Sequence, residues 1–186
     1  MSSLIWIILG IILLILFWII GTYNSLVKLR KMIENAWSQI DVQLKRRHDL
    51  IPNLVNSVKG YMKFEQETLE KVLQARASAI SSKDISKKIE AENQLTGALS
   101  KLLAVVENYP DLKANENVSS LMEELRKTED KISYARQFYN DIVMKYNTKI
   151  SVFPSNIIAS MFKFKEAPFF KVEEAEKEVP NVDLSF

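Results

Sequence analysis

The residues best suited to chemistry stand together in the stretch RRHDLIPNLV, residues 46–55. It holds Arg46, Arg47, the single histidine His48, and Asp49. A histidine beside a carboxylate can serve as a general acid or base, and arginines bind anionic groups. Adjacent residues of a helix point about 100° apart, however, so His48 and Asp49 share a face poorly. The role of residues 46–55 therefore depends on the secondary structure that positions their side chains.

The rest of the composition removes most catalytic and cofactor chemistry. The chain of 186 residues has no cysteine, one histidine and four glycines. Thiol nucleophiles and thiolate metal sites are excluded, and there is no glycine-rich phosphate loop. The carboxylate pair Glu123 and Glu124 is adjacent and meets the same objection as His48 and Asp49. The formal charge of +2 gives no nucleic-acid footprint. We predict no catalytic, cofactor-binding or metal-binding residues, so an enzyme is only a remote alternative.

The N-terminus carries an uncharged apolar run, LIWIILGIILLILFWII, from Leu4 to Ile20. At ~1.5 Å per residue it is about 26 Å long, close to the ~30 Å hydrocarbon core of a bilayer. Trp6 and Trp18 stand near its ends, where aromatic rings prefer the membrane interface. A cleaved signal peptide is the rival, but Met-Ser-Ser lacks a positive charge and FWIIGTYN is a poor cleavage site. We therefore expect residues 1–22 to be an uncleaved transmembrane anchor.

The charges that follow the run set the expected orientation. Lys28, Arg30 and Lys31 come directly after it, and the positive-inside rule places them in the cytoplasm. We expect a single-pass protein of the cell membrane, with its N-terminus outside and the remaining chain in the cytoplasm.

Helical periodicity continues from Tyr23 to about Tyr61. Residues 18 apart fall on the same helical face, and the pairs are apolar on both sides of Pro52: Ile33 with Ile51, Ala36 with Leu54, Ile40 with Val58. This favours one long helix. A new helix capped by Asp49, with Pro52 in its first turn, is the alternative.

Three further helices are expected: residues 66–81, residues 85–107 capped by Asp84, and a long one capped by Asn117 that ends before Pro154. Residues 108–117 are predicted to be a loop. The fold class is all-α, an N-terminal transmembrane helix followed by an antiparallel four-helix bundle with long first and fourth helices. The bundle spans 23–165, and 166–186 form an acidic, loosely ordered tail.

Two arginines interrupt the apolar faces of these helices. Arg47 aligns with Leu29, and Arg76 lies on the apolar face of residues 66–81. Because a buried unpaired charge is very costly, both should join a buried charge network. Glu92 is the first choice of acidic partner and Glu124 the second.

The membrane-near halves of the first and fourth long helices should have only each other for cover. Two helices leave the flanks of their apolar stripes exposed, and exposed patches of this kind mark interfaces. We therefore expect a homo-oligomer. The surface concerned comprises Leu26, Leu29, Ile33, Ala36, Trp37 and Ile40 with Tyr139, Ile142, Val143, Tyr146 and Ile150.

The segment after Pro154 mixes apolar and basic residues: Ile157, Ile158, Met161, Phe162, Lys163, Phe164 and Lys165. Such a segment can lie in a membrane interface with its lysines toward anionic headgroups. The rival, which we favour slightly, is that it plugs the open base of the bundle.

Long blocks of the chain resemble the LemA family, among them YNSLVKLRKMIENAWSQIDVQLKRRHDLIPNLVNSVKGY, LLAVVENYPDLKAN and ELRKTEDKISYARQFYNDIVMKYNTKI. The resemblance covers nearly all of the chain after the anchor. It implies a bacterial membrane protein with one N-terminal span and a cytoplasmic helical bundle. The family includes a member linked to magnetosome membrane formation, and it has no catalytic residues to carry over.

Together these features favour a membrane-anchored, non-catalytic scaffold or interaction protein, self-associating and involved in membrane organisation. A lipid- or ligand-binding module of the membrane surface is the alternative. The expected partners are the lipid bilayer, a second copy of the chain and an unidentified membrane or cytoplasmic protein, without nucleic acid and without a cofactor.

Overall fold

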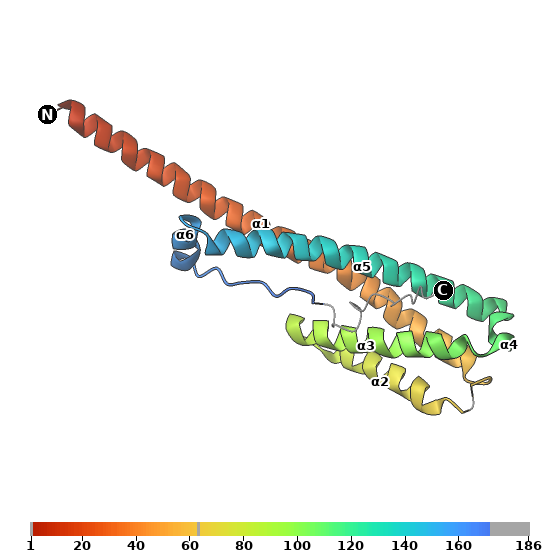
Figure 1. Ribbon diagram of the computed structural model, residues 1–186. Coiled ribbons are helices and arrows are strands. Elements are labelled where there is room, and N and C mark those ends of the chain that lie inside the picture. Colours follow the sequence, from red (N-terminus) through yellow and green to blue (C-terminus); the bar gives the residue numbers. More distant parts are fainter. Residues whose placement is uncertain (1, 63, 172–186) are drawn as a thin grey trace, which may run out of the picture. The chain divides into compact units, whose positions relative to one another are not determined.

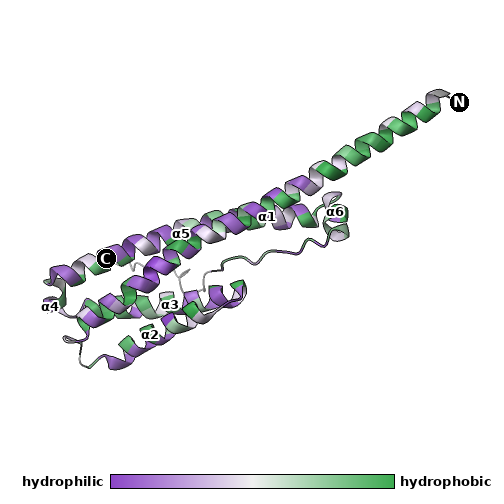
Figure 2. Cartoon of the chain, turned by 180° about the vertical axis from the view of Figure 1, so that it is seen from behind, coloured by the Kyte–Doolittle hydropathy of each residue, from purple (hydrophilic) through white to green (hydrophobic). Residues whose placement is uncertain are grey.

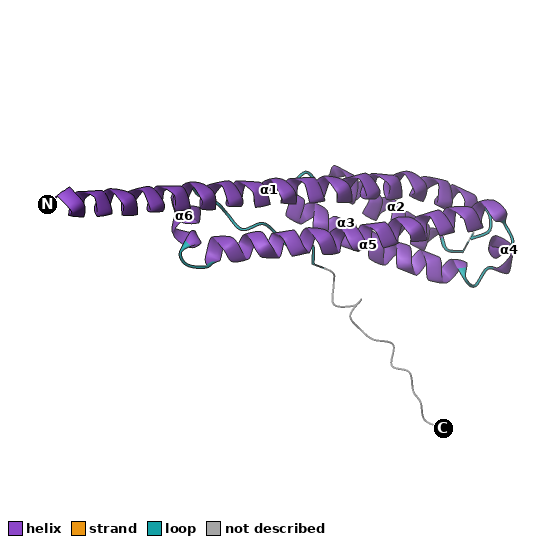
Figure 3. Ribbon diagram, turned by 90° about the horizontal axis from the view of Figure 1, so that it is seen from above, coloured by secondary structure: helices purple, strands orange, loops and turns teal. Residues whose placement is uncertain are grey.

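The computed structural model describes residues 2–62 and 64–171, and this part of the chain is built from helices without a strand (Figures 1 and 3). The all-α class is therefore confirmed. The helices are α1 (Ser2–Val58), α2 (Gln66–Ser81), α3 (Ile85–Val106), α4 (Pro110–Lys113), α5 (Glu116–Ser151) and α6 (Ser155–Met161). The short helix α4 lies where the sequence predicted only a loop.

Helix α1 is continuous and contains Pro52, so the prediction of one long helix is confirmed and the alternative start at Asp49 is wrong. Its N-terminal part is long and apolar enough to cross a membrane, and none of that apolar window is buried (Figure 2). The expected anchor residues are all exposed to the surroundings: Leu4, Trp6, Trp18 and Ile20.

The chain divides into two compact units, and both long helices contribute to each of them. Unit 1 comprises Met1–Ile40 and Ala135–Phe169, and unit 2 comprises Asp41–Tyr134 and Phe170–Phe186.

Unit 2 is organised around a hydrophobic core to which α1, α2, α3, α4 and α5 all contribute. Helix α1 supplies Ile51 and Leu54, α2 supplies Val72, α3 supplies Leu95 and α5 supplies Leu125. Helices α2 and α3 pack against each other after a short turn (Figure 1). The side chain of Asp84 accepts a hydrogen bond from the backbone N–H of Lys87 at 3.1 Å, which satisfies a donor that the first turn of α3 would otherwise leave free.

In unit 1 the apolar stripes of α1 and α5 face each other. The rings of Trp37 and Tyr139 meet edge to face with centroids 5.6 Å apart. The surface that the sequence predicted to be uncovered is mostly buried within the protein: Leu26, Ile33, Ala36, Ile40, Tyr139, Ile142, Val143 and Tyr146. That prediction is wrong, because the chain itself supplies further cover.

The additional cover is a non-helical segment, residues 163–169, which we call the strap. Tyr146 Oη donates to the carbonyl of Lys165 at 3.0 Å, and Tyr139 Oη donates to that of Pro168 at 2.9 Å. The Asn147 amide both donates to and accepts from the backbone of Ala167, each at 2.9 Å. The strap therefore follows α5, and α5 side chains satisfy its backbone.

The first residues of the expected tail are thus held in place. In unit 2, Phe170 is fully buried and the Asn93 amide donates to the carbonyl of Lys171 at 2.8 Å. The rest of the predicted tail, residues 172–186, lies outside the described residues.

Candidate functional site

A buried ion-pair network lies in unit 2 where α1, α3 and α5 meet. Arg47 of α1 is fully buried and forms an ion pair with Glu92 of α3, which is also fully buried. Its other terminal nitrogen donates to Thr96 Oγ1 at 2.9 Å and to both carboxylate oxygens of Glu129 at 2.9 and 3.0 Å. One guanidinium therefore joins three helices with the fork geometry that suits arginine.

His48 completes the surroundings of Glu92. Its Nε2 lies 3.0 Å from Glu92 Oε1, and the imidazole is almost fully buried. Burial by itself would raise the pKa of Glu92. The hydrogen bond with His48 and the charge of Arg47 outweigh burial and hold that pKa below its usual value. Glu92 is thus an ionised carboxylate that is fully buried and held by its neighbours.

Arg76 reaches this region from α2 in a different way. Its Nε donates to the backbone carbonyl of His48 at 2.7 Å. In an α-helix this carbonyl would accept from the N–H of residue 52, but Pro52 has none. Arg76 therefore supplies the donor that the proline removes, which helps a proline to stand inside a long helix.

Glu124 takes a different partner from the one expected. It pairs with Arg46 on a partly exposed part of unit 2, apart from the buried network. Of the four residues predicted to form one network, the structure brings Arg47 and Glu92 into contact and links Arg76 to the backbone of His48. Sequence reasoning missed Glu129 and Thr96, both of which bind Arg47.

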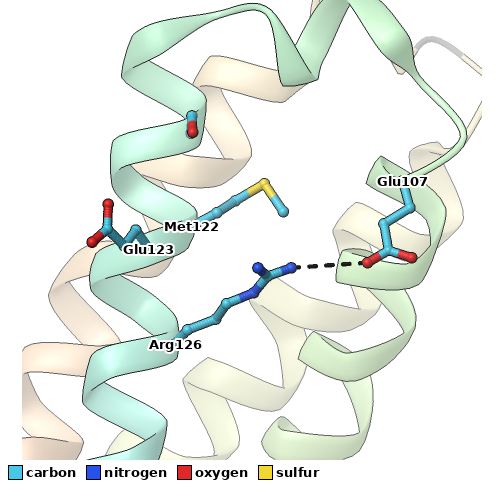
Figure 4. Close-up of a pocket in the computed structure, with 5 residues that line it drawn as sticks. Glu107, Met122, Glu123 and Arg126 are labelled. Atoms are coloured by element: carbon cyan, nitrogen blue, oxygen red, sulfur yellow. Dashed lines mark ion pairs between the residues drawn. The ribbon is translucent and has the colours of Figure 1, made fainter.

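An open cavity of about 480 Å³ lies between the end of α3 and the start of α5. Figure 4 shows Met122 and Arg126 directed toward Glu107, while Glu123 points to the other side. Arg126 lies 3.8 Å from Glu107, and both side chains are largely exposed. Ser119 also lines the cavity. The single histidine belongs to the buried network, so this serine has no imidazole base.

These arrangements do not assemble catalytic machinery within the described residues. No cluster of three or more histidine, aspartate or glutamate residues suited to a metal ion occurs there. The network fastens helices together, and that is the role its geometry supports.

The predicted membrane-interface segment lies in unit 1. Ile158 is buried, whereas Ile157, Met161 and Phe162 remain about half exposed. The rings of Phe162 and Phe164 pack on Tyr23 with centroid distances of 4.7 and 5.9 Å. The segment therefore packs through one face and presents another.

The comparison with known proteins now adds to this geometry. The sequence model of the LemA family matches residues 36–184, which include the buried network, α6 and the strap. The chain belongs to the LemA family.

Two relatives show how far the LemA likeness extends. Protein LemA of Metamycoplasma hominis is 32% identical over 160 residues, covering 85% of this chain and 73% of that protein. Magnetosome protein MamQ 2 of Paramagnetospirillum magneticum is 24% identical over 179 residues, covering 82% of this chain and 66% of that protein. Neither name is that of an enzyme, and together with the long apolar helix they suggest a membrane-associated, non-enzymatic protein.

Proposed function

We propose that this LemA family member is a non-catalytic scaffold, anchored by the N-terminal part of α1, whose helical units lie on the cytoplasmic side of the membrane. One observation carries the proposal. Helix α1 begins with an apolar stretch that no part of residues 2–62 and 64–171 buries, and the same unbroken helix then supplies residues to the cores of both units. One continuous helix thus joins the apolar stretch to both units.

The buried ion-pair network is consistent with a scaffold. Arg47 and Glu92 form an ion pair with each other, and both side chains are fully buried. The name of the MamQ relative associates that protein with the magnetosome, and we extend a role in membrane organisation to this chain. We also infer that the four longer helical segments of unit 2, from α1, α2, α3 and α5, form an antiparallel bundle, because short connections reverse the chain between neighbouring helices.

Cysteine labelling tests the orientation, since the native chain has no cysteine. In intact cells, Ser3→Cys should react with a membrane-impermeant thiol reagent and Ser119→Cys should not. Permeabilised cells should label both. Labelling of Ser119→Cys in intact cells would overturn the proposed orientation, and release of the protein from washed membranes by carbonate would overturn the anchor.

Self-association belongs to the same proposal, but it must use a surface other than the buried α1–α5 pair. Mass measurement in mild detergent across a range of protein concentrations tests it, and we expect a dimer or larger oligomer. A monomer at every concentration would remove self-association and leave the anchored scaffold standing. A reaction catalysed by the purified chain, lost on mutation of the residue responsible, would overturn the non-catalytic assignment.

A further inference from the structure

Unit 1 presents a set of exposed apolar side chains where α5 turns into α6. Helix α6 buries Ile158 and Ala159 against the protein and turns its other face outward. The exposed members are Val152, Phe153, Ile157, Met161 and Phe162, with Phe153 at 80% exposure. Ile157 and Met161 are four residues apart and share a face of the helix. Apolar side chains gathered in this way on a short segment need a partner.

The contacts of this segment place it beside the end of the apolar stretch of α1. Phe162 and Phe164 pack on Tyr23, which follows Ile20 by three residues, a rise of about 5 Å. Lys149 Nζ, at the end of α5, bonds to Ser25 Oγ two residues further along α1. In Figure 2 the hydrophobic stretch of α1 extends to the level of α6. The headgroup region of a bilayer lies at this depth, since the hydrocarbon core is ~30 Å thick and the whole bilayer ~40–45 Å.

Charge favours the same partner. Unit 1 contains eight lysines and arginines against three aspartates and glutamates, a net charge of +5, although the whole chain carries only +2. Lys28 and Arg30 follow the apolar stretch on α1, and Lys163 and Lys165 follow α6; all four are exposed. An anionic leaflet attracts basic groups held close to its surface.

The backbone fixes the lysine at the corner. Lys163 has φ of 57°, the left-handed conformation in which glycine is usual at a helix C-terminus. Its N–H donates to the carbonyl of Ser160 at 3.1 Å, and the N–H of Phe164 donates to that of Ala159 at 2.9 Å. This pair of bonds is a Schellman motif, which ends α6 and sends the chain back past Tyr23. A lysine with a charged side chain thus occupies a turn that a glycine would form with less strain.

We propose that the α5–α6 turn and α6 form a membrane foot, defined as Val152, Phe153, Ile157, Met161 and Phe162 with Lys163 and Lys165, which enters the anionic leaflet beside the transmembrane stretch. The occupant of the exposed apolar face is therefore lipid. The inference rests on the proposed anchor, because the foot lies at the bilayer only if α1 spans it.

Fluorescence in lipid nanodiscs tests the foot in the full-length chain. An environment-sensitive dye is attached to Ile157→Cys, to Phe17→Cys in the apolar stretch, or to Gln137→Cys, an exposed polar position of α5 in the same unit. In nanodiscs of phosphatidylcholine with phosphatidylglycerol, lipids bearing a nitroxide near the headgroup should quench the dye at Ile157→Cys. Nitroxides deep in the acyl chain should quench at Phe17→Cys. The dye at Gln137→Cys should respond only to a water-soluble quencher.

The outcomes separate the two proposals. If the dye at Phe17→Cys is quenched while that at Ile157→Cys behaves like Gln137→Cys, the foot is refuted and the anchor stands. If the dye at Phe17→Cys escapes lipid quenching, the anchor itself fails. If the emission of the dye at Ile157→Cys indicates an apolar environment that disappears with one chain per nanodisc, a second copy of the chain covers the surface and the foot is refuted. If that apolar environment persists with one chain per nanodisc but lipid nitroxides do not quench the dye, the surface packs against the protein itself and the foot is refuted.

Two sets of variants define the chemistry of the foot. Phe153→Ser with Met161→Ser should abolish lipid quenching at Ile157→Cys without lowering the melting temperature, because both side chains are exposed. Ile158→Ser is the matched control, since its buried side chain should lower the melting temperature instead. Lys163→Gln with Lys165→Gln should remove the gain in quenching that phosphatidylglycerol gives over phosphatidylcholine alone. Unchanged quenching in both sets would overturn the proposal.

Discussion

Replacing Arg76 by methionine should destabilise unit 2 more when residue 52 is proline than when it is alanine. His48 is a buried residue, and its carbonyl lacks the helical donor that Pro52 cannot provide and accepts from Arg76 Nε at 2.7 Å. Methionine keeps most of the aliphatic packing of the arginine and removes its donors. The change therefore isolates the hydrogen bond.

The expected size follows from the fate of that carbonyl. With Pro52 present, Arg76→Met leaves the carbonyl without this charged donor, which costs ~1.5–3 kcal/mol. With Pro52→Ala, the new N–H of residue 52 can donate within the helix, and the same change should cost only ~0.5–1.5 kcal/mol. The two mutations should thus be coupled by about 1 kcal/mol in the free energy of unfolding.

The assay is a double-mutant cycle, with the unfolding of all four chains followed by circular dichroism in one detergent. Any effect of Pro52→Ala on helix propensity alone cancels in the cycle. Arg46→Met is the matched control, because Arg46 also stands near Pro52 on α1 but binds the carboxylate of Glu124. Its effect should be the same with either residue at position 52. Additive effects of Arg76→Met and Pro52→Ala, within ~0.3–0.5 kcal/mol, would refute the account of the proline.

Three further predictions concern the network and the strap. Arg47→Met should lower the free energy of unfolding by ~3–5 kcal/mol because it removes the arginine from a buried ion pair and leaves Glu92 with only His48 as a partner, whereas Arg46→Met at a half-exposed pair should cost at most ~1 kcal/mol; equal effects in denaturation would contradict the network. The lowered pKa of Glu92 means that its ionisation stabilises the fold above the usual carboxyl pKa of ~4.3 and that this stabilisation is lost as pH falls toward the folded-state pKa. The stability difference between the native chain and Glu92→Gln should therefore shrink on acidification, and a constant difference in melts across pH would count against it. Asn147→Ala should accelerate hydrogen exchange at the N–H of Ala167, which Asn147 Oδ1 accepts; unchanged exchange by mass spectrometry would show that the strap is held elsewhere.

The spacing of apolar residues predicted the fold class and the buried face of α1. When one face of a long helix is buried, apolar residues recur about every 3.6 positions. Arg47 and Glu92 were chosen from their positions on apolar arcs, and they form one ion pair in the structure. Glu129 was missed because it lies beside the stripe of α5, and a long arginine reaches residues outside the apolar arc. Thr96 was missed because a hydroxyl carries no charge that points to a partner.

The partner of Arg76 could have been predicted, since Pro52 identifies the carbonyl of residue 48 as lacking its helical donor. The prediction considered only carboxylates as partners of Arg76 and not a backbone carbonyl. The cap of α5 was misplaced for a similarly local reason. The backbone N–H groups of Asn117 and Val118 lie 3.1 and 3.3 Å from Asn115 Oδ1, so Asn115, two residues before the expected Asn117, accepts from them. Both asparagines are suitable N-caps by type, and only the geometry of the turn distinguishes them.

The strap explains why most of the surface predicted for self-association is buried within the chain. Periodicity detects helices, but residues 163–169 cover the α1–α5 pair without being helical. Their backbone is satisfied by Tyr139, Tyr146 and Asn147, so the two tyrosines placed on an apolar seam also act as hydrogen-bond donors to a third layer. A covered pair of helices gives no hydrophobic reason for a second copy to bind there. In unit 1 the foot and the transmembrane stretch supply most of the large exposed apolar side chains, and the foot packs on Tyr23, just after that stretch. Hydrophobic burial in this unit therefore favours lipid rather than a second copy of the chain.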